Sequence, residues 1–301
     1  MPVLRAPRAP PPRQNTKGKR MPKLPTPIVA LIAIAVAVDL VCLACLLVLR
    51  RRGVYIKLRT KFGPAIVFDS QDDDGVPIRL LNVGGKFQSV SYVQDSLRYR
   101  LVCVYHRYFA QIVDIAGLKD GREGRALVIG GGGYSFPKWL VSSCPRLSTT
   151  VVEIDPAITD IARRFFFLDD LEREFRTRED GRLDLVCDDG WGYLTRSGER
   201  FDLIVNDAFG GKRPLGPLKT EDGARRVRDH LAEGGVYLAN VISPLEGKGT
   251  DVLADSLDAC KATFEHVYLI PEAPESPRLT GDNVLVASNA RLKIQARYVV
   301  K

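Results

Sequence analysis

The sequence predicts an α/β protein built around a doubly wound, mostly parallel sheet. From Arg125 onward, short apolar runs typical of buried strands alternate with longer stretches that have helical apolar spacing. The first of these strands runs directly into a run of four glycines, and the next three strands end in acidic residues. Because ligands bind beyond the carboxyl ends of the strands in such a sheet, these residues predict one binding edge.

The predicted elements follow this alternation closely. Seven strands are expected, at residues 126–130, 149–154, 184–187, 203–206, 235–241, 266–270 and 284–288. Helices are expected at residues 135–143, 156–167, 190–196, 219–232 and 250–263. The last two strands lie close together in the sequence, as in the seven-stranded, Rossmann-like methyltransferase fold, where the final strand inserts antiparallel. We therefore assign residues 119–301 to a domain of this fold.

Residues 53–118 are expected to form a small β-hairpin domain and a helix that leads into the main sheet. Three strands are predicted, at residues 65–68, 78–83 and 86–92. An Asp-Asp-Asp-Gly sequence separates the first two and is typical of a turn. Apolar residues at near-helical spacing predict the helix over residues 97–115.

The N-terminal segment has a different composition. Residues 1–26 contain seven prolines and seven basic residues, which predicts a disordered, extended tail. Residues 28–49 follow, and Asp39 is the only charged residue among these 22 positions. At about 1.5 Å per residue, a helix of this length crosses a hydrocarbon core of about 30 Å. We expect one uncleaved transmembrane helix, with membrane lipid as its partner.

The positive charge belongs to this N-terminal segment. The whole chain carries a net +8, whereas residues 1–61 alone carry +12, so the remainder is mildly acidic at −4. This distribution favours an anionic membrane surface and gives no reason to expect a nucleic-acid partner. The basic cluster Arg50–Arg52 follows the apolar stretch directly and favours a cytoplasmic C-terminal domain on a single-pass cell-membrane protein.

The six cysteines are scattered and show neither a disulfide framework nor metal-ligand spacing outside the apolar stretch. No metal is expected. Reduced, buried thiols agree with a cytoplasmic domain.

The glycine run and the acids after the next strand point to a nucleoside. Glycines at 130–133 let the backbone approach a ligand where a Cβ atom would collide. Glu153 follows Gly133 by 20 positions and, with Asp155, ends the next predicted strand. An acidic residue at this place accepts hydrogen bonds from ribose hydroxyl groups.

Two further strand ends extend this set of residues. One predicted strand ends in Asp188, Asp189 and Gly190, and the next ends in Asn206 and Asp207. Acids on the third and fourth strand ends are not the pattern of dinucleotide dehydrogenases. They suit adenosine bound through its ribose and its adenine amine, as in S-adenosylmethionine enzymes.

With these motifs in place, the chain resembles the spermidine synthase (polyamine aminopropyltransferase) family over residues 64–290. The glycine run corresponds to the family's Gly-Gly-Gly-Asp-Gly loop, and Phe87-Gln88-Ser89 resembles a hairpin segment that helps to line the family's site. The resemblance implies catalysis by Asp207. It implies binding of the adenosyl donor by Gln88, Gly130, Gly131, Gly132, Gly133, Glu153, Asp155, Asp189 and Gly190.

Two departures from the family pattern concern cationic groups. Gly133 stands where the family's loop has an aspartate for the donor's ammonium group, and Gly210 stands where the catalytic loop has its second aspartate. Each missing charge-assisted hydrogen bond forfeits roughly 1.5–3 kcal/mol. The segment after Asp207, with Pro217 and Lys219-Thr220, is more similar to spermidine synthase-like domains fused to membrane transporters. We expect a divergent, membrane-anchored branch.

The sequence alone allows two interpretations of Asp189 and of Tyr134. Asp189 also fits the N-cap of a helix that begins near Trp191, and both roles can coexist. Tyr134 fits either as a filler of the volume left by the missing aspartate or as a packing partner of Trp139. His106 and His230 lie in predicted helices and are expected to be packing or surface residues.

Three classes of function stay open at this point. The first is transfer of an aminopropyl or related group from decarboxylated S-adenosylmethionine to a small-molecule amine or other nucleophile. The second is methyl transfer from intact S-adenosylmethionine. The third is a non-catalytic, membrane-tethered nucleoside-binding or scaffold protein. The acceptor stays open in each case, as does the oligomeric state, with a homodimer as one option.

Overall fold

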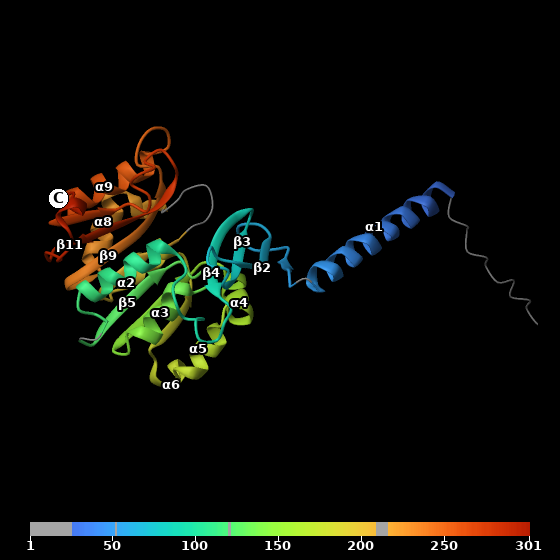
Figure 1. The fold of residues 1–301 in the computed structure, drawn as a ribbon, viewed down its shortest axis with the longest axis horizontal. Helices are drawn as coiled ribbons and strands as arrows, with labels where there is room; N and C mark the ends of the chain where they lie inside the picture. The colour runs from blue at the N-terminus through green and yellow to red at the C-terminus, as the bar shows by residue number, and fades with distance from the viewer. Residues whose placement is uncertain (1–25, 52, 120–121, 209–215) are drawn as a thin grey trace, which may run out of the picture. The chain divides into compact units, whose positions relative to one another are not determined.

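The computed structural model describes residues 26–51, 53–119, 122–208 and 216–301. The predicted tail over residues 1–26 lies almost wholly outside these ranges, and so does Gly210. The chain divides into two compact units, Met1–Arg52 and Gly53–Lys301 (Figure 1).

Helix α1 (Thr26–Arg51) is the described part of the first unit. Its stretch Ala30–Leu49 is long and apolar enough to cross a membrane. Apolar side chains such as Leu31 and Val41 are about two-thirds exposed, at 66% and 62%. The predicted helix over residues 28–49 is therefore present, and its large apolar side chains are exposed among the described residues.

A four-stranded antiparallel sheet opens the second unit, with strand order β1-β2-β3-β4. Its strands are Tyr55–Lys57, Ala65–Gln71, Pro77–Val83 and Lys86–Tyr92. In the predicted turn between β2 and β3, Asp72 Oδ1 accepts hydrogen bonds from the backbone N–H groups of Asp74 and Val76. The short strand β1 was not predicted, because three residues are too few to show a period-two pattern.

Helix α2 (Val104–Ile115) begins later than the sequence predicts. Residues 97–103 form a turn followed by irregular chain instead, with a hydrogen bond from Arg100 N–H to Leu97 O. Leu101 is nevertheless buried, at 8% exposure. The apolar spacing was correct about burial, but burial alone does not require a helical backbone.

The main sheet has seven strands in the order β10-β11-β9-β8-β5-β6-β7. Strands β5 to β9 are parallel, and β11 lies antiparallel between β9 and β10. This arrangement confirms the predicted fold class, including the inserted antiparallel strand. The strands are Gly124–Ile129, Leu147–Glu153, Leu183–Cys187, Phe201–Asn206, Leu231–Ser243, His266–Ile270 and Gly281–Ser288.

Helices cover both faces of this sheet (Figure 1). The strands are apolar on both faces, and their side chains point alternately into two hydrophobic cores, one on each face. On β5, Ala126 and Val128 join the core that includes α2, whereas Leu127 and Ile129 join the other core. The remaining α-helices are α3 (Ser135–Ser143), α4 (Pro156–Phe165), α5 (Leu168–Glu174), α6 (Thr177–Asp180), α7 (Gly190–Arg196), α8 (Glu221–Asp229) and α9 (Asp251–Thr263).

Helix boundaries in the main domain also differ from those expected. The chain turns at Phe167, with φ of 61°, between α4 and the short helix α5. It turns again at Arg176, with φ of 53°, between α5 and the short helix α6. Non-glycine residues with positive φ carry no turn signature in the sequence, so neither helix was predicted. The predicted helix over residues 219–232 is a 3₁₀ turn (Gly216–Lys219) followed by α8, and β9 begins already at Leu231.

Candidate active site

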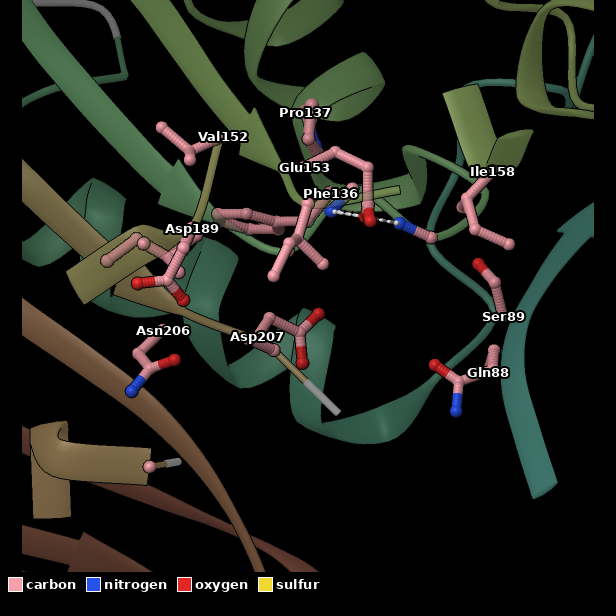
Figure 2. Close-up of a pocket in the computed structure, with 18 of the residues that line it drawn as sticks. Gln88, Ser89, Phe136, Pro137, Val152, Glu153, Ile158, Asp189, Asn206 and Asp207 are labelled. Atoms are coloured by element: carbon pink, nitrogen blue, oxygen red, sulfur yellow. Dashed lines mark hydrogen bonds between the residues drawn. The ribbon is translucent and has the colours of Figure 1, made fainter. Parts of the chain in front are cut away.

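A cavity of about 290 Å³ lies at the carboxyl ends of β5, β6, β7 and β8. This volume is close to the lower end of the range for small-molecule sites. Figure 2 shows part of its wall, with Gln88 and Ser89 contributed by β4. Eight of the ten sequence-predicted site residues line the cavity: Gln88, Gly130, Gly131, Gly132, Glu153, Asp189, Gly190 and Asp207.

The first three glycines of the turn are favoured either by close approaches of neighbouring atoms or by positive φ. Gly130 has φ of 98°, and a Cβ atom there would lie 2.5 Å from the backbone oxygen of Asp207. A Cβ atom at Gly131 would lie 2.7 Å from the ring of Tyr134. Gly132 has φ of 52°, which favours glycine. The turn therefore lies directly against Asp207, which follows β8.

Gly133 does not line the cavity. A Cβ atom at Gly133 would lie 2.7 Å from Ser89 Oγ and 2.9 Å from Phe166 Cδ1, so the place for a side chain is already occupied. The hydroxyl group of Tyr134 is hydrogen-bonded to Thr159 at 2.8 Å, and its ring lies close to Gly131 in the same core against which Trp139 packs.

Glu153 ties the glycine turn to the end of β6. Its Oε2 accepts hydrogen bonds from the N–H groups of Gly131 at 2.8 Å and Gly132 at 3.3 Å, and its Oε1 accepts from Asp155 N–H at 2.9 Å. Burial raises the pKa of this carboxyl group, and these three N–H groups oppose the rise. Oε1 keeps acceptor capacity for a ligand hydroxyl group.

Asp155, predicted as part of the site, does not reach the cavity wall. Its Oδ1 accepts a hydrogen bond from Ala157 N–H at 3.0 Å as the N-cap of α4, and its Oδ2 accepts from Lys61 N–H at 2.6 Å. The side chain is buried, at 3% exposure. In this structure Asp155 orders the helix start and attaches residues of the β1–β2 loop.

Asp189 lines the cavity and is also the N-cap of α7, with Oδ2 accepting a hydrogen bond from Gly192 N–H at 2.8 Å. Both roles expected from the sequence are therefore geometrically compatible. Gly190 is needed for packing, since a Cβ atom there would lie 2.3 Å from Ile129 Cγ2. The neighbouring Asp188 forms an ion pair with Arg196, which lowers the pKa of Asp188.

Asp207 follows β8 and is held by two side chains from α2. His106 Nε2 lies 2.9 Å from Asp207 Oδ2, and the Tyr105 hydroxyl group donates to the same oxygen at 3.2 Å. Asn240 Nδ2 lies 3.5 Å from Oδ1. Burial, and next the charge of Asp207, raise the pKa of Tyr105 well above its usual value, so Tyr105 remains a hydrogen-bond donor.

The two histidines, both expected to be packing or surface residues, differ in their distance from the cavity. The ring nitrogens of His230 lie 2.8 Å and 2.9 Å from the backbone carbonyl oxygens of Arg226 and Ser197, and the residue does not line the cavity. His106 lines the cavity, and its ring stacks on Phe136 with centroids 5.6 Å apart. No local sequence pattern linked His106 to a residue 101 positions away.

One buried amide group belongs to Asn206, a predicted strand-end residue to which the sequence assigned no role. Asn206 lines the cavity and is fully buried, and its Nδ2 donates to the hydroxyl group of Tyr237 at 3.3 Å. Its Oδ1 has no hydrogen-bond partner among the described residues. A buried acceptor of this kind favours a ligand that brings an N–H or O–H group.

Comparison with known families agrees with this geometry. Residues 104–277 match the model of the spermine/spermidine synthase domain. A polyamine aminopropyltransferase from Vibrio vulnificus is 30% identical over 186 residues, which cover 59% of this chain and 56% of the relative. A polyamine aminopropyltransferase from Thermococcus kodakarensis is 29% identical over 196 residues, which cover 63% and 62%. The chain thus spans less than two-thirds of these relatives.

Solved structures agree in fold. A probable spermidine synthase from Corynebacterium glutamicum superposes with a TM-score of 0.64 at 19% identity, over 79% of this chain and 80% of that chain. A spermidine synthase in complex with the transition-state analogue AdoDATO has a TM-score of 0.59 at 17% identity, over 79% and 74%. Because the family model covers more than half of the sequence, the chain belongs to the spermine/spermidine synthase family.

Proposed function

We propose that the chain is a transferase that binds S-adenosylmethionine or its decarboxylated form as donor substrate and transfers an aminopropyl or related group to an amine. The observation that carries this proposal is the position of Asp207. Two donors hold its Oδ2 at the edge of a cavity whose other lining groups suit adenosine.

The cavity wall offers a partner for each part of an adenosyl group. We assign the ribose hydroxyl groups to Glu153, whose Oε1 keeps acceptor capacity beside the glycine turn. We assign the adenine amine to Asp189, whose Oδ1 makes no hydrogen bond to another described residue. Apolar side chains, including Val152 and Ile129, lie in the same wall and suit the adenine ring.

The reaction requires little covalent chemistry from the protein. The lone pair of the acceptor amine forms a C–N bond with the carbon next to the sulfonium, the C–S bond breaks, and a neutral thioether leaves. The amine loses one proton, and we assign its acceptance to Asp207 Oδ1, because His106 and Tyr105 hold Oδ2 whereas Oδ1 has the longer contact of 3.5 Å with Asn240 Nδ2. The cavity can hold the donor and the acceptor in the orientation that the reaction needs.

We expect putrescine to be a poor acceptor for this chain. Gly133 contributes no carboxylate, and no carboxylate stands at Gly210 in the sequence. Calorimetry should show micromolar binding of a thioether nucleoside product. A steady-state assay with decarboxylated donor and putrescine should show little or no spermidine. Turnover within the ordinary range of roughly 1–10³ s⁻¹ would instead show that other residues hold the cationic acceptor.

We also propose that the first unit anchors the protein in the cell membrane and that the second unit lies in the cytoplasm. The exposed apolar side chains of α1 and the adjacent basic cluster Arg50–Arg52 support this. The full chain should sediment with membranes and resist high salt, whereas a chain beginning at Gly53 should remain in the supernatant. Sedimentation of that shortened chain at high salt would contradict the assignment of the anchor to α1.

A further inference from the structure

A fully buried lysine lies behind the cavity and takes no part in the chemistry proposed above. Lys138 on α3 is 0% exposed, and its Nζ donates to Ser91 Oγ at 3.1 Å and to the Phe166 carbonyl at 2.5 Å. No ion pair joins it to a carboxylate among the described residues. Burial lowers the pKa of Lys138 to about 7. Burying an amino group without an ion pair destabilises the fold, so a specific role for Lys138 is expected.

Hydrogen bonds connect Lys138 to the cavity wall through three buried serines. Ser91 Oγ lies 3.2 Å from Ser135 Oγ, and Ser135 Oγ lies 3.3 Å from Ser89 Oγ. All three side chains are at most 7% exposed. Ser89 and Ser135 line the cavity. The chain of contacts therefore leads from a buried amine to the place where a ligand binds.

The positions of the hydroxyl protons determine which serine donates and which accepts in each of these hydrogen bonds. Ser135 has one hydroxyl proton and donates it to the Val90 carbonyl at 2.7 Å. Ser135 must therefore accept from both Ser89 and Ser91, while Ser91 accepts from Lys138. With its proton directed at Ser135, Ser89 offers the cavity only its lone pairs. It is fixed as a hydrogen-bond acceptor.

The cavity wall on the β4 side is neutral. Gln88 and Ser89 are the residues that β4 contributes, whereas the carboxylates Glu153, Asp188, Asp189 and Asp207 come from the ends of the main strands. The glycine turn lies against this side, with the Cβ position of Gly132 3.9 Å from Ser89 Oγ. A donor whose ribose is held at Glu153 can therefore extend its tail toward Gln88 and Ser89.

We propose that Ser89, held as an acceptor by Ser135 and Lys138, binds the ammonium group of the donor's tail, and that this neutral site accepts donors with or without an α-carboxylate. A neutral acceptor binds an ammonium group without repelling a neighbouring carboxylate, and the Gln88 amide can donate to that carboxylate. Ser89 is the specificity-determining residue, and Ser135 and Lys138 are positioning residues. The assignment rests on the adenosyl-binding function proposed above.

Three stable thioether nucleosides separate the parts of this proposal when calorimetry measures their binding to the full chain. Methylthioadenosine has no ammonium group, S-adenosyl-3-thiopropylamine has one, and S-adenosylhomocysteine adds the carboxylate. We expect the two amines to bind within about threefold of each other. Each should bind about tenfold or more tighter than methylthioadenosine, as a hydrogen bond to a charged group gives.

Substitutions at Ser89, Ser135 and Lys138 test the proposal directly. Ser89→Ala should weaken both amines by about tenfold or more and leave methylthioadenosine unchanged, and Lys138→Met and Ser135→Ala should show the same selective loss at smaller size. Ser142→Ala is the matched control, because Ser142 lies on the same helix and its hydroxyl group bonds, among the residues that the structure describes, to the Trp139 carbonyl and not to the other serines. Thermal unfolding of each variant verifies that it is folded.

The possible failures are distinguishable. If the unmodified chain binds none of the three compounds, the adenosyl-binding function is wrong and this assignment falls with it. If all three bind but Ser89→Ala changes none of them, or weakens all three equally, only the role of Ser89 is overturned. If S-adenosyl-3-thiopropylamine binds more than tenfold tighter than S-adenosylhomocysteine, the site discriminates against the α-carboxylate and that part of the proposal is wrong.

Discussion

Replacing Asp207 by asparagine is expected to lower turnover by roughly 10²–10⁴-fold, the usual contribution of a positioned general base. The amide keeps the shape of the side chain and can still contact His106 and Tyr105, but it cannot take a proton from the acceptor amine. The measurement is the release of the thioether nucleoside, because every acceptor gives this product. Affinity for that nucleoside should change by less than about threefold.

Asp184→Asn is the matched control for this variant. Asp184 is an exposed aspartate on β7 and does not line the cavity, so both turnover and nucleoside affinity should stay as in the unmodified chain. Turnover retained in a folded Asp207→Asn protein would remove the general-base role and leave Asp207 as a structural residue at the end of β8.

Replacing Glu153 by alanine is expected to weaken binding of adenosyl ligands by about 1.5–3 kcal/mol, or roughly 10–150-fold. The variant loses the acceptor for ribose and also leaves the N–H groups of Gly131 and Gly132 without their carboxylate partner. Calorimetry with a thioether nucleoside measures the first effect, and thermal unfolding measures the second.

Glu233→Ala provides the comparison, because Glu233 is exposed on β9 and does not line the cavity. We expect its nucleoside affinity to equal that of the unmodified chain. A folded Glu153→Ala protein with unchanged affinity would exclude the ribose role and leave Glu153 as a carboxylate that only orders the glycine turn.

The sequence by itself determined the order of elements in the main domain and the edge of the sheet where the site lies. Apolar periodicity and glycine placement are local properties, so the strand ending at Ile129, the turn after it and the acids of the next three strands were predictable. The turns at Phe167 and Arg176 were not, because their positive φ comes from packing rather than from residue type.

Tertiary structure alone decided which side chains meet. The contact of His106 with Asp207 joins residues 101 positions apart, and the contact of Ser89 with Ser135 joins residues 46 positions apart. Asp155 looked equivalent to Glu153 as a strand-end acid, yet it turns to cap α4 while Glu153 faces the cavity. A local pattern fixes the element on which a residue lies. Its hydrogen-bond partner depends on the packing of distant elements, for which no local signal exists.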